Sequence, residues 1–169
     1  TMRDPMQSQP VLPEDLILLL PRVPLFLSLT MPEIRLVAAI AEEVRLEPGE
    51  YLTHVGDVLD AVYVLCEGEM ELVTADGNRT RPVLPSEDYG LVSLVEPRRV
   101  AQGNRAVVPT RLVRIQGDAL HVLMDSDTSI GLTLWRNIAR LQTYHFIQLV
   151  DRWAGVAPVD RFNPYMRGL

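Results

Sequence analysis

Turns that contain glycine divide residues 45–117 into short segments, and this close spacing is the strongest constraint on the fold. The turn signals are Pro48-Gly49, Gly56-Asp57, Gly68, Asp76-Gly77 and Gly103-Asn104. Between them, "AVYVLC" is rich in β-forming residues, "EMELV" alternates, and "TRLVRI" predicts a further strand. The segment "ADGN" is a strong hairpin-turn signal. So many short strands predict a small barrel or jelly roll and exclude an alternating βαβ fold.

Helical patterns precede these strands. We expect residues 1–12 to be a flexible lead-in and residues 13–44 to be an N-terminal helical segment. Its first helix begins at Pro13, has acids in its first turn, and ends at Pro21. The stretch "TMPEIRLVAAIAEEV" predicts a second helix with a Thr30–Glu33 capping box. Its apolar face is expected to contain Ile34, Val37, Ile40, Ala41 and Val44.

Residues 118–154 predict C-terminal helices, followed by a tail at 155–169. We expect Asp118 to cap "DALHVLM", the acids at 125–127 to form a capping loop, and a long helix to run from about Ile130 to Trp153. Seven positions of this helix follow the 3,4 spacing of a coiled-coil seam: Leu132, Trp135, Ala139, Gln142, Phe146, Leu149 and Trp153. A second stripe contains Leu134, Ile138, Leu141 and His145.

Two apolar stripes on one helix must both be buried, so we expect one to pack on the barrel and the seam to form a homodimer. Gln142 would then set the register of the pair. The alternative is that another segment of the same chain, such as the first short helix, covers the exposed stripe.

Composition excludes several classes of protein. The net charge of −6 argues against nucleic acid as a partner of this chain alone. The single cysteine, Cys66, excludes an internal disulfide and lies in an apolar strand, which is typical of a core residue. His54, His121 and His145 are too widely separated to predict a metal site. With no catalytic motif, signal peptide or membrane-length apolar run, the sequence predicts a cytoplasmic protein that is not an enzyme.

Five motifs in a fixed order resemble the cyclic nucleotide-binding domain of the catabolite activator protein and of cyclic-nucleotide-gated channels. They are "VPLFLSL", "LEPGEYLTHVGD", "AVYVLCEGEMELV", "YGLVSLVEPRRVA" and "LVRIQGDALHVLM", and the resemblance covers about 23–149. It implies an eight-stranded double-stranded β-helix (jelly roll) over 45–117, with N-terminal helices and a long C-terminal helix. It also implies a phosphate-binding cassette at 89–102. Gly49, Gly56 and Gly68 fall at the family's turn glycines.

In the implied cassette, Gly90 lets backbone N–H groups approach an anion and "LVSLV" is the short helix that follows. The resemblance makes Arg99 the arginine that binds phosphate, and Arg98 fits less well. The implied ligand-binding residues are Gly90, Leu91, Val92, Arg99, Val100 and Ala101. Three further arginines, Arg105, Arg111 and Arg114, either add positive charge near the cassette or are solvated strand residues.

The chain departs from the family pattern at several of these positions. Leu91 stands where the family's glutamate binds the ribose hydroxyl, Val100 replaces the hydroxyl residue that contacts phosphate, and Gln102 replaces threonine. The segment between glycine and arginine is also one residue short. Each lost partner costs about 1–3 kcal/mol, so two losses move a micromolar ligand toward millimolar affinity. We therefore expect weakened or altered binding of a cyclic nucleotide or another anionic nucleotide, and the sequence establishes no cofactor.

These observations predict a non-enzymatic regulatory or sensor domain that is part of a larger protein. A transporter, channel or repeat domain could be fused upstream, in which case the chain is a cytoplasmic domain of a membrane protein. The alternative is a structural dimerisation or docking module without a ligand. A trimmed transcription regulator is a distant alternative, because "AGVAPVDRFNPYMRGL" is too short and proline-rich for a helix-turn-helix.

Overall fold

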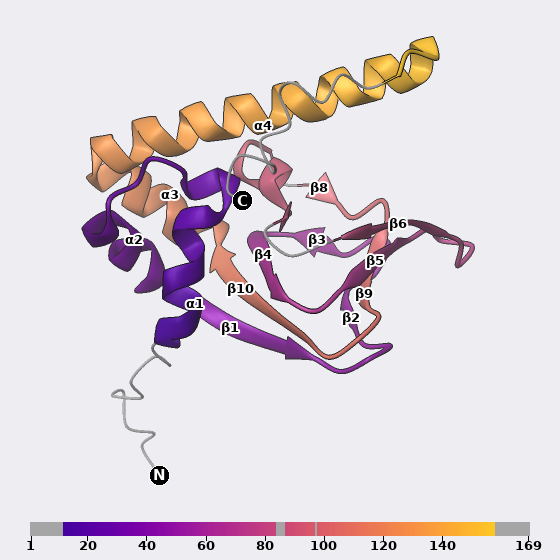
Figure 1. Ribbon diagram of the computed structural model, residues 1–169, viewed down its shortest axis with the longest axis horizontal. Helices are drawn as coiled ribbons and strands as arrows, with labels where there is room; N and C mark the ends of the chain where they lie inside the picture. The colour runs from indigo at the N-terminus through magenta and orange to yellow at the C-terminus, as the bar shows by residue number, and fades with distance from the viewer. Residues whose placement is uncertain (1–11, 84–86, 97, 158–169) are drawn as a thin grey trace.

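Two four-stranded antiparallel sheets, a two-stranded sheet and a set of flanking helices make up the fold of the described residues, as seen in the computed structural model (Figure 1). The structure describes residues 12–83, 87–96 and 98–157. Residues 1–11 of the expected lead-in, residues 158–169 of the expected tail, and Pro97 in the cassette lie outside the described residues.

The N-terminal helical segment forms as expected but is shorter than the sequence predicted. It contains α1 (Glu14–Leu19), two 3₁₀ turns, η1 (Leu20–Arg22) and η2 (Pro24–Phe26), and α2 (Met31–Ala38). The Thr30–Glu33 capping box is confirmed. The prediction that helix α2 continues through "AIAEEV" is wrong, because the chain becomes a strand at Ala41. There it pairs with β10 over six residues, and backbone hydrogen bonds to another strand outweigh local helix propensity.

The described residues form ten strands. They are β1 (Ala41–Leu46), β2 (Tyr51–Thr53), β3 (Val58–Leu59), β4 (Ala61–Glu67), β5 (Met70–Val73), β6 (Arg79–Val83), β7 (Asp88–Tyr89), β8 (Arg98–Arg99), β9 (Gly103–Ala106) and β10 (Thr110–Gln116). Eight lie in two four-stranded sheets, β1-β10-β4-β7 and β2-β9-β5-β6, and β3 pairs with β8. The jelly-roll prediction is confirmed. Gly103-Asn104, however, was predicted to be a turn and begins strand β9.

Two apolar clusters share the sheet β1-β10-β4-β7. One face of this sheet packs against the helices through residues such as Val62, Val64, Val113 and Ile115. The other face packs against the second sheet, with Leu65, Leu112 and Met70 in the interior of the jelly roll. Burial on both faces explains why "AVYVLC" reads as an almost continuous apolar run rather than an alternating one.

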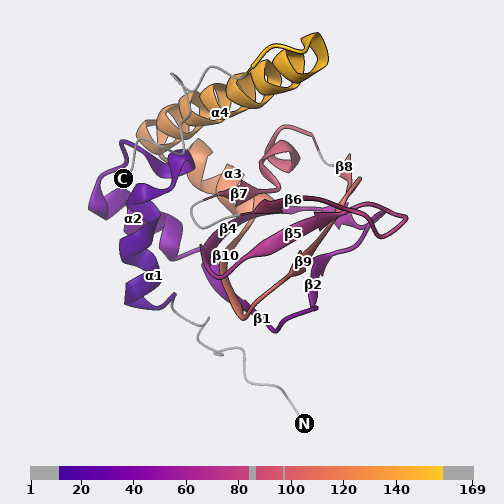
Figure 2. The ribbon, with the colours of Figure 1, turned by 45° about the vertical axis from the view of Figure 1, so that its right-hand side comes forward.

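Two helices follow the strands, α3 (Gly117–Ser126) and α4 (Thr128–Ala154). Asp118 lies in the first turn of α3, but its side chain makes no capping hydrogen bond, so that prediction is wrong. Asp127 caps α4 by accepting hydrogen bonds from Ser129 and Ile130, as the acidic capping loop predicted. The first half of α4 lies on the other helices, whereas its second half extends past them above the strands (Figures 1 and 2).

Candidate functional site

The cassette predicted at 89–102 is a short irregular connection between strands β7 and β8. It contains Gly90, the 3₁₀ helix η3 (Leu91–Leu94), and then β8, which pairs with β3. Gly90 has a φ of 93°, in the left-handed region, and a Cβ there would lie 2.3 Å from the carbonyl oxygen of Ala61 on β4. Packing against β4 therefore requires glycine at this position, independently of any ligand.

Two of the cassette positions where the chain departs from the family pattern are filled by buried apolar side chains. Leu91 is 2 % exposed and belongs to the cluster under the helices, and Val100 is 5 % exposed and belongs to the cluster between the sheets. Neither could donate or accept a hydrogen bond. Ser93 is also buried, and its hydroxyl donates to the Gly90 carbonyl at 2.6 Å, which holds η3 in shape. Val92 is exposed and presents only a methyl surface.

Arg99 lies on the exposed strand β8 at the edge of the jelly roll. Its Nη1 donates to the carbonyl oxygen of Gly56 at 2.8 Å. Arginine has five N–H donors, so most of them remain available after this contact. Within the described residues, neither Arg99 nor Arg98 forms an ion pair.

The other arginines of this region are engaged with carboxylates. Their partners are Glu71 for Arg105; Asp15, Glu43 and Glu67 for Arg111; and Glu42 for Arg114, with Asp60 at 3.8 Å. The expected alternatives, added positive charge or solvated strand residues, are therefore both wrong for these three. The hydrogen bonds from Arg111 lower the pKa values of the Asp15 and Glu43 carboxyls. This leaves the unpaired positive charge of the region at Arg98 and Arg99.

A group of polar side chains, which no sequence pattern predicted, lies between the two sheets. The hydroxyls of Thr53 on β2 and Tyr89 on β7 are 2.9 Å apart, and the Tyr89 hydroxyl also donates to the Gln102 carbonyl at 3.4 Å. Burial raises the pKa of the Tyr89 phenol. Asn104 on β9 is completely buried, and its side-chain oxygen and nitrogen have no hydrogen-bond partner among the described residues. The turn prediction at Gly103-Asn104 had concealed this inward-facing position.

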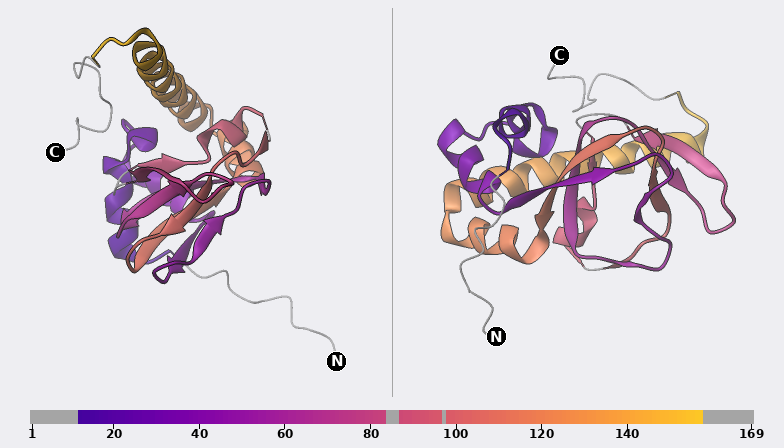
Figure 3. Two further views of the ribbon diagram at one scale, coloured as in Figure 1. Left: turned by 90° about the vertical axis from the view of Figure 1, so that its right-hand side faces the viewer. Right: turned by 90° about the horizontal axis from the view of Figure 1, so that it is seen from below.

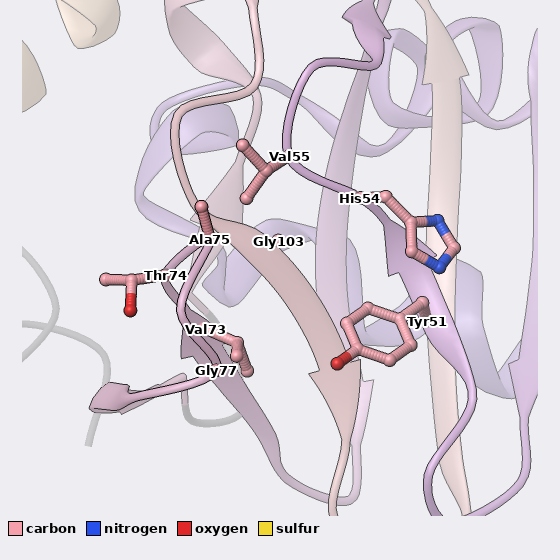
Figure 4. Close-up of a pocket in the computed structure, with 8 residues that line it drawn as sticks. All are labelled: Tyr51, His54, Val55, Val73, Thr74, Ala75, Gly77 and Gly103. Atoms are coloured by element: carbon pink, nitrogen blue, oxygen red, sulfur yellow. The ribbon is translucent and has the colours of Figure 1, made fainter.

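A groove of about 390 Å³ lies on the sheet β2-β9-β5-β6 (Figure 4). It is lined by Tyr51, His54, Val55, Val73, Thr74, Ala75, Gly77 and Gly103. The rings of Tyr51 and His54 stack with centroids 4.5 Å apart, and the Arg105 guanidinium lies 5.6 Å from the Tyr51 ring. Among the cassette residues that the structure describes, none lines this groove.

The histidine and cysteine side chains considered as metal ligands or reactive groups have structural roles instead. Within the described ranges, no cluster of histidine, cysteine and acidic side chains could hold a metal ion. Burial raises the pKa of the Cys66 thiol to about 11, so the thiolate that reacts and binds metals is scarce at neutral pH. The Nε2 of His121 on α3 donates to the Leu94 carbonyl of η3 at 2.8 Å, and its ring lies 5.9 Å from that of Trp135 on α4.

The predicted seam of α4 is exposed, and the second stripe is buried at its first three positions, whereas its last residue, His145, is exposed. Leu134, Ile138 and Leu141 pack into the core together with the N-terminal segment. Asn137 fixes this contact by donating from Nδ2 to the carbonyls of Leu25 and Leu27 at 2.9 and 2.8 Å. On the seam, Phe146 is 65 % exposed and Trp153 is 89 % exposed. The first short helices therefore cover the second stripe and not the seam.

Comparison with known proteins agrees with this architecture. The family model described as "Cyclic nucleotide-binding domain" matches residues 43–127, half of the chain. The chain belongs to the cyclic nucleotide-binding domain family. None of the curated proteins matches this cyclic nucleotide-binding domain. In the part of the chain that the structure describes, no helix is both long and apolar enough to cross a membrane.

Several solved structures resemble this cyclic nucleotide-binding domain. A cyclic nucleotide-binding-like protein from Brucella abortus is 30% identical, with 66% of this chain and 98% of that chain covered and a TM-score of 0.57. A putative cyclic nucleotide-binding protein from Geobacter metallireducens is 28% identical, with 75% and 92% covered and a TM-score of 0.62. The N-terminal domain of a transcriptional regulator from Streptomyces coelicolor is 28% identical, with 85% and 99% covered and a TM-score of 0.67.

Proposed function

We propose that this chain is a non-enzymatic regulatory domain that binds an anionic nucleotide through Arg99 and cassette backbone groups. The observation that supports this most strongly is the pairing pattern of the arginines. Arg105, Arg111 and Arg114 are engaged by acids, whereas Arg99 holds only the Gly56 carbonyl within the described residues. An exposed guanidinium with free N–H donors is suited to a charge-assisted contact with a phosphate.

The same geometry supports weakened affinity. Leu91 and Val100 are buried in apolar clusters, so neither can supply the polar contacts that the family pattern places there. Each unpaired ligand group costs about 1–3 kcal/mol. We therefore expect an affinity for cyclic AMP or cyclic GMP in the millimolar range.

Ligand occupancy would be transmitted to α4, which we propose forms a homodimer through its exposed seam. His121 links the two regions, because its ring nitrogen holds the Leu94 carbonyl of the cassette and its ring packs near Trp135 of the seam. A cassette that shifts on binding would therefore displace a side chain that contacts the dimer surface.

Thermal unfolding and calorimetric titration test the ligand site. A ligand at 100 times its dissociation constant stabilises a protein by about 2.7 kcal/mol, which is a shift on the order of 5–10 °C for a chain of this length. We expect almost no shift from micromolar cyclic AMP or cyclic GMP, and a shift of several degrees only at about ten or more times a millimolar dissociation constant. Arg99→Ala should weaken binding by about 1.5–3 kcal/mol with little effect on folding, and Arg98→Ala, the neighbouring exposed arginine, should have less effect.

A clear shift at micromolar concentration would contradict the weakened site. If Arg99→Ala and wild type bind equally, the arginine is not the phosphate contact. If neither cyclic nucleotide nor inorganic phosphate binds at any concentration, the second candidate is favoured, a dimerisation module without a ligand. The burial of Leu91 and Val100 supports that candidate, and so does the exposed seam.

A further inference from the structure

Two buried asparagines of this structure have opposite hydrogen-bonding situations. Asn137 is 4 % exposed and donates to two backbone carbonyls of the N-terminal segment. Asn104 is fully buried, and neither polar atom of its amide has a partner within the described residues. A buried amide without partners is unfavourable for folding, and native proteins rarely leave one unpaired without a functional reason.

Asn104 faces the interior of the jelly roll. On β9 it lies opposite Leu72 of β5 and Thr53 of β2, and residues directly opposite each other in a sheet share one face. Leu72 packs against the cluster between the sheets, which identifies that face as the inner one. The next residue, Arg105, lies on the other face and pairs with Glu71.

The surroundings of Asn104 connect it to the cassette. The hydroxyl of its neighbour Thr53 is shared with Tyr89, which comes from the opposite sheet and directly precedes Gly90. Tyr89 also donates to the carbonyl of Gln102, two residues before Asn104. The polar group between the sheets therefore lies next to both ends of the cassette, and Arg99 stands on the strand just before it.

We infer that Asn104 is the residue that recognises the base of the bound nucleotide, an inference that rests on the function proposed above. A carboxamide presents one donor and one acceptor side by side, and this arrangement pairs bidentately with a base edge that offers the complementary pair, as adenine does through N6 and N7. The base lies between the sheets against Leu72 and Val100, and Arg99 holds the phosphate at the edge. When the base enters between the sheets, it breaks the hydrogen bond between the hydroxyls of Tyr89 and Thr53.

This assignment explains two features together. Leu91 and Val100 are apolar, so polar contacts to the sugar and phosphate are reduced. The contact between Asn104 and the base then supplies the specificity for one nucleotide over another. A polar residue is also retained on the inner face of β9, where the next inward position is Ala106. An amide kept for a ligand should lower the stability of the empty protein.

The same substitution at both asparagines tests the inference. Leucine is close to asparagine in shape and removes both polar atoms. Asn104→Leu should raise the melting temperature of the ligand-free chain by roughly 2–8 °C, because it removes an unpaired buried amide. Asn137→Leu, the matched control, should lower the melting temperature, because it leaves two carbonyls without their donor.

Ligand binding is measured on the same proteins by calorimetry with cyclic AMP, cyclic GMP and the cyclic monophosphate of purine riboside, which has no exocyclic group on its base. Wild type should prefer the better of the first two over the purine analogue by about 10- to 100-fold. Asn104→Leu should lose this preference while its residual binding still depends on Arg99.

Two results would overturn the inference and leave the proposed function standing. One is a lower melting temperature for ligand-free Asn104→Leu, which would show that structural water satisfies the amide. The other is an Asn104→Leu variant that binds with the base preference of wild type. If wild type binds none of the three nucleotides and no inorganic phosphate, the proposed function fails, and the inference fails with it.

Discussion

Replacing Gly90 tests whether the cassette keeps its shape through packing alone. Gly90→Ala combines two costs. An alanine at a φ of 93° is strained by about 1–2 kcal/mol, as a left-handed residue. Its Cβ would also lie 2.3 Å from the Ala61 carbonyl oxygen, a backbone atom that cannot rotate away. Relieving such an overlap shifts the backbone and costs typically another 1–3 kcal/mol.

Gly77 in the β5–β6 hairpin is the matched control. It has a φ of 83° and nothing within 4 Å of an added Cβ, so Gly77→Ala carries the strain without the overlap. At about 2–4 °C per kcal/mol for a chain of this length, Gly77→Ala should lower the melting temperature by roughly 2–8 °C. Gly90→Ala should lower the melting temperature further, by about 4–20 °C, as measured by calorimetry without ligand. Equal losses in the two variants would refute the argument that the cassette is held against β4.

Two further predictions concern the dimer surface and the ion pairs. Sedimentation at tens of micromolar should report twice the chain mass, and the Trp135→Glu/Phe146→Glu double variant should give a folded monomer; a wild-type monomer at that concentration would exclude the proposed dimer. Arg111 lowers the pKa values of Asp15 and Glu43, so these carboxylates stabilise the fold above their usual pKa of about 4, and this contribution is lost as the pH falls through their lowered values. Arg111→Gln should therefore be less stable than wild type at pH 7 in urea unfolding, with a difference that shrinks below about pH 4. A difference that does not change with pH would contradict this origin.

The elements that sequence predicted well are those specified by local interactions. The capping box of α2, the hairpin at Asp76-Gly77 and the cap of α4 each depend on side chains within a few residues of one another. The local sequence pattern was sufficient to predict these three elements, because no distant segment of the chain offers their residues alternative partners. The sequence also predicted two separate stripes on α4, and the structure places the exposed seam and the buried residues of the second stripe on different faces of that helix.

The predictions that were wrong depend on distant partners. Residues 41–46 have a helix-like composition, yet β10 supplies a strand partner for every one of them (Figure 3). The arginines of β10 also form ion pairs with the acids of β1. Gly103-Asn104 resembles a turn by composition, but it is placed between β2 and β5. The Asn104 position in the site was missed for the same reason, because only the pairing of β9 shows which of its residues face inward.

The shape of the cassette and its ability to bind a ligand have different physical origins in this chain. Gly90, Leu91, Ser93 and Leu94 are all buried, so packing against β4 and the helices determines the course of the loop. A loop held in this way keeps its shape after its polar ligand contacts are lost. Its sequence also continues to resemble the cassette motif of the family, because the buried residues that fix the shape are retained. Binding then depends on polar groups that packing leaves unsatisfied. In the described residues the clearest of these are Arg99, which has no acid partner, and Asn104, whose amide has no partner. One lies at the edge of the jelly roll and the other in its interior, so variants at these two positions separate recognition of the phosphate from recognition of the base.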